Sequence, residues 1–508
     1  MFKKAIAAAF AVLVVFSYAK AEEIKVDFDG KANQSFNLTE TINSVSLDVA
    51  APEATEVAVT DKKPKVAKEW TIMVFLNNKN NLHRYGLKDM NEMEMVGSTD
   101  KVNIVVELGA GADSTGYSFK GTKRYYVTKD NNTGVLSSQV VQNLGKVDMG
   151  DYNHMAEFGQ WAKANYPAGK YMLVVWNHGS GWEKSLKAAM SKGISYDDET
   201  DNHITTPQFG AALKAMGKID VVGSDACLMG MAEVVYELKD SVTYVVGSEE
   251  TEPGDGYTYN TMLAPLAAKP AMSPAEFAKN AVQAYVDHYA GIGEGSTQAY
   301  IKTSALSGFL TAVNDFATAM TNSGDRTLVK ASLNQAQSYA ISDNKDLYHF
   351  AELMAAGTKD AAVKEKGQAL MTYIKTKLVG HNAYSGGYSD SHGIAIYMPS
   401  YGAGDGYDEL QWAQAANWDE FIKWYQAKDE TAPDAKLTGD KGLAQTIFDA
   451  CISWAVSKAC DKVWDVVKKE YVEICKESKT CTEYETTPAP TQTTPNQQYS
   501  VDHNLQRY

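Results

Sequence analysis

Two mostly apolar runs stand in the middle of the chain: Tyr171-Met172-Leu173-Val174-Val175-Trp176 and Ile219-Asp220-Val221-Val222-Gly223. The first is followed at once by Asn177-His178-Gly179 and the second by Ser224-Asp225-Ala226-Cys227. Between them, residues 206–216 show the apolar spacing of a helix. Short β-branched runs that alternate with helices are typical of a parallel sheet covered on both faces.

The same alternation extends in both directions from these runs. It predicts strands over 70–76, 102–108, 125–127 and 242–246, and helices over 82–95, 155–164 and 231–238. After a mostly helical stretch from 272 to 378, a strand over 393–398 is predicted to complete the same sheet. We therefore expect an α/β fold with an open, mostly parallel sheet and helices on both faces.

The first 21 residues have the pattern of an export signal. Two lysines precede the apolar run 5–15, and Ala19-Lys20-Ala21 fits the small-x-small cleavage pattern. A membrane anchor is the alternative, but the run is shorter than the ~20 apolar residues that a span needs. The mature protein is expected to be periplasmic or extracellular, and to begin with a lead-in or pro-segment over residues 22–67.

The net charge and the cysteines narrow the protein class. A net charge of -15 in 508 residues argues against a nucleic-acid partner, which requires basic patches. Four clustered cysteines mark residues 429–484 as a small, helical, disulfide-prone segment, with three possible pairings and no CxxC spacing that would favour a metal. Residues 485–508 are predicted to be a disordered Thr/Pro-rich tail. The clustered cysteines are Cys451, Cys460, Cys475 and Cys481, and the fifth, Cys227, stands alone.

Cys227 and His178 each follow a predicted strand. Because the carboxyl ends of parallel strands meet at one edge of a sheet, the two side chains are expected to lie over the same edge. A thiolate can attack an acyl carbon, while an imidazole takes the thiol proton and later protonates the leaving amine. The backbone N–H groups of Gly179 and Cys227 could then hold the oxyanion, and Asn177 could orient His178.

Structural interpretations stand beside this chemical one. A histidine after a strand is often structural, and a buried lone cysteine is often inert. His392, in Ser391-His392-Gly393, is a competing base, but it precedes its predicted strand and should face the opposite edge.

Several motifs in order resemble those of the clostripain family, which belongs with the caspase-like cysteine peptidases. The resemblance covers residues 69–265 and extends more weakly to about 425, so a peptidase domain over 68–428 is expected. Two positions depart from the family pattern: Asn78 or Lys79 stands where an acidic residue is usual, and Asn177 where Ser is common. The motifs are Trp70-Thr71-Ile72-Met73-Val74, Asn80-Asn81-Leu82, Asp89-Met90-Asn91-Glu92-Met93-Glu94, Asn177-His178-Gly179-Ser180-Gly181-Trp182, Asp225-Ala226-Cys227-Leu228-Met229-Gly230, and Ser248-Glu249-Glu250 through Pro253-Gly254-Asp255-Gly256.

The resemblance implies a caspase-like sheet and an endopeptidase that cuts after Arg or Lys with a His178–Cys227 dyad. Asp225 and Asp255 match the family positions that receive the basic P1 side chain, and a carboxylate can pair with either Arg or Lys. For Asp225 the alternative role is that of a helix N-cap. The chemistry requires no cofactor.

Two further properties follow from the resemblance alone. Such enzymes resemble zymogens that cut themselves after a basic residue in the loop behind the catalytic histidine, here Lys192, with Lys184 and Lys187 as alternatives. Family members are often calcium-dependent, and Asp197-Asp198-Glu199-Thr200-Asp201 is rich in oxygen ligands, although its spacing is not that of an EF-hand. Which residues would hold a metal is unknown from the sequence.

The favoured function is therefore a secreted peptidase acting on proteins or peptides. One alternative is a catalytically silent caspase-like binding module, which active-site labelling would distinguish. The other is a transpeptidase, which uses the same dyad but needs an amine acceptor.

Overall fold

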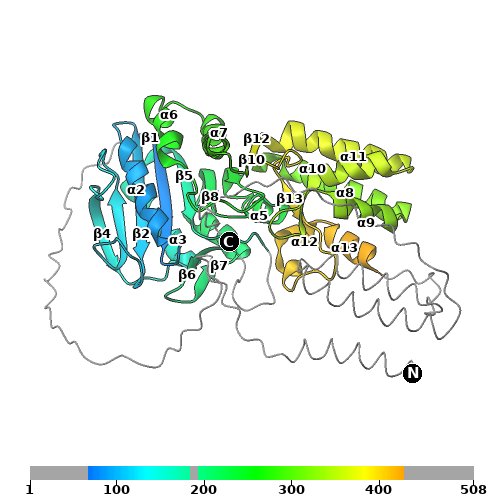
Figure 1. Ribbon diagram of the computed structural model, residues 1–508, viewed down its shortest axis with the longest axis horizontal. Coiled ribbons are helices and arrows are strands. Elements are labelled where there is room, and N and C mark those ends of the chain that lie inside the picture. Colours follow the sequence, from blue (N-terminus) through cyan, green and yellow to red (C-terminus); the bar gives the residue numbers. More distant parts are fainter. Residues whose placement is uncertain (1–66, 183–192, 428–508) are drawn as a thin grey trace, which may run out of the picture. The chain divides into compact units, whose positions relative to one another are not determined.

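The computed structural model describes residues 67–182 and 193–427. Their main feature is a nine-stranded sheet in the order β12-β10-β9-β8-β5-β1-β2-β3-β4 (Figure 1). Its five central strands are parallel to one another. They are β1 Lys68–Asn78, β2 Val102–Ala110, β5 Ala168–Trp176, β8 Ile219–Asp225 and β9 Val242–Gly247.

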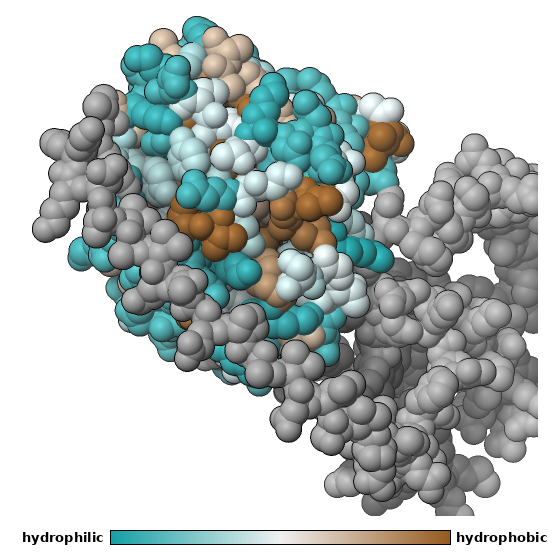
Figure 2. Space-filling view, turned by 90° about the vertical axis from the view of Figure 1, so that its left-hand side faces the viewer, coloured by the Kyte–Doolittle hydropathy of each residue, from teal (hydrophilic) through white to brown (hydrophobic). Residues whose placement is uncertain are grey.

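Antiparallel pairs extend the sheet at both edges. β3 (Gly121–Tyr126) and β4 (Gln139–Gly145) follow β2 on one side, and β10 (Ser296–Lys302) and β12 (Val379–Ser385) follow β9 on the other. Figure 2 looks onto the side of the molecule where β4 lies, and shows a mostly hydrophilic surface with a few separate hydrophobic patches. This edge is thus polar surface and not part of a core.

Alternating side chains of the central strands face two separate hydrophobic cores. In β5, Met172, Val174 and Trp176 belong to one core, and Leu173 and Val175 to the other. The first core is covered by α2 (His83–Val96), α6 (Tyr259–Ala268) and α7 (Pro274–Ile292). The second is covered by α3 (Tyr152–Asn165), α4 (Thr206–Met216) and α5 (Ala232–Glu237). Helices on both faces confirm the predicted layering.

The second core continues into the later helices, whose apolar side chains pack against it. The described residues also form two small antiparallel sheets of two strands each. One consists of β6 (Ile194–Asp197) and β7 (Asn202–Ile204), and the other of β11 (Asn344–Asp346) and β13 (Ala395–Tyr397). The remaining elements are η1 Thr303–Ala305, α8 Leu306–Ser323, α9 Arg326–Gln335, α10 Leu347–Gly357, α11 Ala361–Tyr373, η2 Ile374–Leu378, η3 Tyr407–Glu409, α12 Gln411–Ala415 and α13 Trp418–Gln426.

The prediction that residues 393–398 complete the main sheet was wrong. The strand forms as β13, but it pairs antiparallel with β11 in a separate sheet, and β10 and β12 take the outer positions beside β9. β10 was not predicted from the sequence because its buried side chains include Thr297 and Gln298, so the strand lacks a continuous apolar run. Thr297 shares a hydrogen bond with Ser248, and Gln298 donates one to Glu252. Such partners allow polar side chains to be buried in a strand.

Some predictions fall outside the described residues. They are the export signal at 1–21, all but the last residue of the lead-in over 22–67, the cysteine-containing segment over 429–484 and the tail over 485–508, and the cleavage sites Lys184, Lys187 and Lys192. Within the described ranges, no helix has the length and apolarity needed to cross a membrane.

Candidate active site

The loops that carry His178 and Cys227 leave neighbouring strands at the same level. β5 and β8 are parallel, Trp176 is in register with Asp225, and the Asn177 N–H donates to the Asp225 carbonyl at 3.2 Å. A Cβ at Gly179 would lie only 2.5 Å from the Cys227 carbonyl oxygen, so no larger residue fits there without movement. The structure thus brings together the two loops that the sequence placed at one edge.

His178 is held by Asn81, a residue of the Asn80-Asn81-Leu82 motif for which no role was predicted. Its Nε2 lies 2.7 Å from Oδ1 of Asn81, which is in the turn between β1 and α2. With the Asn81 oxygen as acceptor, the neutral ring carries its proton on Nε2 and its lone pair on Nδ1. Asn81 follows β1, the other neighbour of β5, so the strand-end rule that selected His178 could also have selected it.

Asn177, which was expected to orient the histidine, instead forms side-chain hydrogen bonds to two neighbouring strands. Its side chain donates to the carbonyls of Asn77 and Tyr196, at 2.6 and 3.2 Å, and accepts from the Tyr196 N–H at 2.7 Å. It therefore fastens the β5 exit to β1 and β6 without contributing the hydrogen bond that holds the imidazole. Its effect on His178 acts through the backbone.

Cys227 is fully buried, and its neighbours fix the turn that carries it. Its Sγ accepts a hydrogen bond from the Glu252 N–H at 3.1 Å. The next residue, Leu228, has a φ of 63°, a left-handed conformation that costs a leucine on the order of 1–3 kcal/mol. The Leu228 N–H donates to the Glu250 carbonyl at 3.1 Å. A strained turn directly after the thiol is thus held by the segment that follows β9.

Asp225 is enclosed at the end of β8. Its Oδ1 accepts from the Tyr257 N–H at 3.0 Å, and its Oδ2 accepts from the Tyr259 hydroxyl at 2.8 Å. The side chain has no exposed surface. The alternative role as a helix cap was wrong, because the N-cap of the following helix, α5, is Met231.

Asp255 lies nearer the surface and pairs with a lysine from α2. Its Oδ2 is 3.0 Å from Nζ of Lys88, and each side chain is 40% exposed. Burial alone would lower the pKa of Lys88, but the hydrogen bond to Asp255 and the charges of Glu92 and Asp255 raise it. Glu92 in turn accepts from the Tyr259 N–H at 2.9 Å. Residues 252–259 therefore contact Cys227, Asp225 and α2.

His392 belongs to a different cluster. Its Nδ1 is 3.1 Å from Oδ1 of Asp346, and its ring stacks on Tyr348 with centroids 4.0 Å apart. The adjacent Gly393 N–H donates to Glu249 at 3.0 Å. His392 thus has a structural position, where it connects the residues before β13 to the start of α10 through Asp346 and Tyr348.

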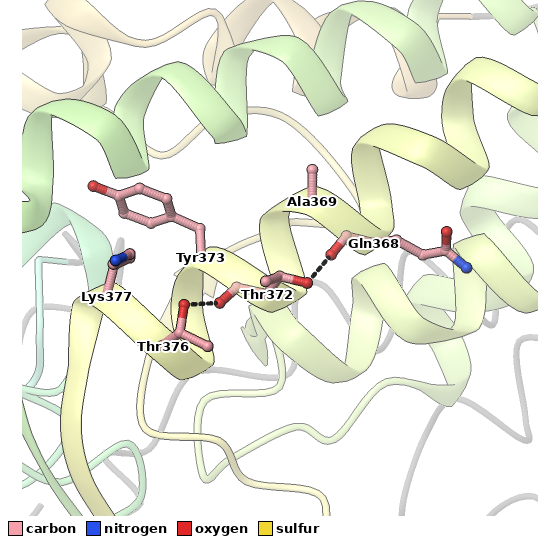
Figure 3. Close-up of a pocket in the computed structure, with 6 residues that line it drawn as sticks. All are labelled: Gln368, Ala369, Thr372, Tyr373, Thr376 and Lys377. Carbon is pink, nitrogen blue, oxygen red and sulfur yellow. Dashed lines mark hydrogen bonds between the residues drawn. The ribbon is translucent and has the colours of Figure 1, made fainter.

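Two cavities in the described residues include neither His178 nor Cys227 in their walls. One cavity of about 380 Å³ lies along α11 and η2, where Thr372 and Thr376 donate to helix carbonyls one turn earlier (Figure 3). Its lining includes no cysteine, histidine or carboxylate. A larger cavity of about 820 Å³ includes Asn80 and Asn81 in its wall, next to the partner of His178. Within the described residues, no three His, Cys, Asp or Glu side chains are grouped to hold a metal ion.

Comparison with known proteins gives consistent results. The model of the clostripain family matches residues 74–425. Clostripain from Hathewaya histolytica is 26% identical over 251 residues, which cover 43% of this chain and 46% of that protein, so the match spans less than half of the relative's length.

Solved structures of C11 proteases share the fold. A secreted C11 cysteine protease from Bacteroides thetaiotaomicron, in complex with an irreversible peptide inhibitor, has a TM-score of 0.54 at 22% identity and covers 69% of this chain and 100% of its own. An inactive zymogen C11 protease from Parabacteroides distasonis has a TM-score of 0.53 at 16% identity and covers 70% and 99%. These likenesses confirm the predicted caspase-like α/β fold.

Proposed function

This chain belongs to the clostripain family, and on that premise we propose that it is a cysteine endopeptidase that hydrolyses peptide bonds after Arg or Lys. Cys227 is the nucleophile and His178 is its general base. The observation that carries the proposal is the contact between the two strand exits, where Gly179 lies against the Cys227 backbone.

The chemistry uses groups that the fold already positions. His178 takes the thiol proton at the ring nitrogen left unprotonated by the Asn81 hydrogen bond, and the thiolate attacks the carbonyl carbon of the substrate. The N–H groups of Gly179 and Cys227 stabilise the oxyanion. His178 then gives its proton to the leaving amine, and water hydrolyses the thioester. Asn81 acts as a positioning residue for the base.

Selectivity for a basic P1 residue rests on Asp225 and Asp255. Both lie beside the segment that touches the thiol: Asp225 accepts from Tyr257, and Asp255 is within that segment. A guanidinium can pair with a carboxylate through two hydrogen bonds, and an ammonium through its point charge. Because Asp225 and Cys227 have no exposed surface, the residues that cover them must move before a substrate can reach either.

This closed arrangement is compatible with activation by self-cleavage. We place the cut after Lys192, with Lys184 and Lys187 as alternatives, in the loop between His178 and β6. Export by the amino-terminal signal would bring the enzyme to the periplasm or the medium, where protein and peptide substrates are its partners.

The test uses the purified wild type and two variants, Cys227→Ala and His178→Ala, with fluorogenic peptides that end in Arg, Lys, Asp or Leu. We expect cleavage after Arg or Lys only, and its loss in both variants. An irreversible peptide inhibitor should label the wild type and not Cys227→Ala. A wild type that neither cleaves nor becomes labelled, even after nicking between residues 183 and 193, would instead support a silent binding module. Added amine that diverts the product to an amide would indicate a transpeptidase.

A further inference from the structure

Lys79, directly after β1, is a buried lysine surrounded by oxygen atoms. Its Nζ is 3.3 Å from Oδ2 of Asp197 and 3.2 Å from Oε2 of Glu199, and it donates a hydrogen bond to the Val147 carbonyl. The side chains of Lys79 and Asp197 are 1% and 0% exposed. An ion pair this deep differs from a surface pair, because removing one partner leaves an uncompensated charge out of water.

The surrounding oxygens are held in place by further hydrogen bonds. Asp197 accepts from the Met149 N–H at 2.9 Å and from the Glu199 N–H at 3.0 Å. Glu199 accepts from the Ala112 N–H at 2.6 Å. Segments that follow β1, β2, β4 and β6 thus converge on one positive charge.

These residues do not fit a bound calcium ion. Calcium takes six to eight oxygen ligands, and the Asp197–Asp201 turn offered such ligands in the sequence. In the structure, however, the ammonium of Lys79 lies between the two carboxylates that would bind first. The chain supplies its own cation at this point.

The backbone around Lys79 links the buried ion pair to His178, the proposed general base. Lys79 accepts from the Asp198 N–H through its carbonyl at 3.0 Å, and the neighbouring Asn80 donates to the Tyr196 carbonyl at 3.1 Å. Asn81, the next residue, holds His178. The Asp197–Asp201 turn and the segment that orients the histidine are therefore one connected unit.

We propose that Lys79 is a built-in cation that replaces a bound divalent metal, so that the wild type needs no calcium for stability. Replacing Lys79 by an uncharged side chain should turn the same oxygen cluster into a cation site. The proposal concerns folding stability, so it stands or fails independently of the proposed hydrolysis.

The experiment compares the melting temperature of full-length wild type, Lys79→Met and Lys146→Met in excess EDTA and in millimolar CaCl2. Lys146 is an exposed lysine in the wall of the same cavity, and Lys146→Met removes an equal charge. We expect Lys79→Met to melt roughly 5–10 °C lower in EDTA, as the loss of a buried ion partner implies, and to recover several degrees in CaCl2. The wild type and Lys146→Met should melt at the same temperature in both buffers.

Three results would overturn the proposal: a wild type that loses stability in EDTA, a Lys79→Met variant as stable as the wild type, or a destabilised variant that does not respond to CaCl2. If Lys79→Met does not fold, Lys79→Arg serves in its place, because it keeps the charge and should remain insensitive to calcium. A Lys79→Arg variant that melts higher in CaCl2 than in EDTA would also contradict the built-in cation.

Discussion

At the residue scale, Gly179 sets how closely the two strand exits approach. A methyl group at this position would meet the Cys227 carbonyl at 2.5 Å and the Ala226 Cβ at 3.0 Å. We expect Gly179→Ala to lower kcat/KM by roughly 10²-fold, because a shift of about 1 Å would misplace the thiol and the proposed oxyanion donors. The unfolding free energy should fall by about 1–3 kcal/mol from overpacking.

Gly169→Ala is the matched control for this change. Gly169 lies at the other end of β5, where a Cβ would come no closer than 3.7 Å to its nearest neighbour, the Glu69 carbonyl oxygen. Peptide hydrolysis and thermal melting of the two variants measure the difference. Equal activity in Gly179→Ala and Gly169→Ala would mean that the close contact has no catalytic importance.

Lys88 is the second residue whose replacement should change the kinetics of peptide hydrolysis. Its ammonium holds the Asp255 carboxylate that a basic P1 side chain would use. Because this pair is half-exposed and worth about 0–1 kcal/mol, we expect Lys88→Met to lower KM for Arg and Lys peptides by at most roughly fivefold, with kcat unchanged. Arg84→Met removes an exposed charge one turn earlier on α2 and should leave KM unchanged. A higher KM in Lys88→Met would argue against Asp255 as a P1 contact.

Sequence reasoning could place His178 and Cys227 because both follow apolar runs, and strand ends of a parallel sheet share an edge. It could not find the Lys88–Asp255 or Lys79–Asp197 pairs. Those contacts join residues more than a hundred positions apart, and no periodicity in the chain records which charges will meet.

At the element scale, buried carboxyl groups join β9 to the helical region. Glu249 follows β9, and burial together with the nearby Asp346 raises its pKa well above the usual value. Burial lowers the pKa of His392, but its hydrogen bonds to Asp346 and the Asp390 carbonyl and the charges of Asp346 and Glu352 together raise it. Both groups therefore bind protons more tightly in the folded state than in the unfolded state.

The raised pKa values of Glu249 and His392 determine how the stability of the protein changes with pH. A group with a raised folded-state pKa stabilises the protein fully below its unfolded pKa, and this stabilisation is lost as the pH rises through the folded value. We expect the melting temperature of the wild type to fall as the pH rises from about 5 to 8, with each unit of pKa difference worth about 1.4 kcal/mol. Glu249→Gln, which imitates the protonated acid, should flatten this decline.

Glu365→Gln provides the comparison, since it makes the same change at an exposed position of α11 and should retain the wild-type slope. Melting curves across the pH range measure both. Parallel slopes for wild type and Glu249→Gln would show that Glu249 does not titrate as inferred.

Elements with continuous apolar runs were predictable, and those with other patterns were not. β1, β2, β5, β8 and β9 are buried on both faces, so their sequence alone marks them as strands. β4 and β12 are edge strands that are mostly exposed or half-buried, and β10 buries hydrogen-bonded polar groups. β13 was found, but strand pairing depends on tertiary packing, which placed β11 beside it.

At the scale of the whole molecule, the charge of the chain favours cationic substrates. Its net charge is -15, and Asp255 is close enough to Glu92 and Glu294 to raise the pKa of both in addition to the larger effect of burial. A negative field attracts a basic peptide, and salt screens it over about 10 Å at 0.1 M ionic strength. We expect kcat/KM for a peptide with Arg at P1 and no acidic residue to fall roughly 3–10-fold between low and about 0.5 M salt, while kcat stays constant.

A peptide with the same Arg at P1 and a distant Glu that cancels its charge is the control. Its kcat/KM should fall by less than half as much on a logarithmic scale, because only the proposed local contacts with Asp225 and Asp255 then favour its binding. Equal salt dependence for the two peptides would show that the overall charge contributes nothing to substrate capture. A salt-independent kcat/KM for both would show that the overall charge does not contribute to selectivity, and would leave the two carboxylates proposed for the P1 pocket, Asp225 and Asp255, as its entire basis.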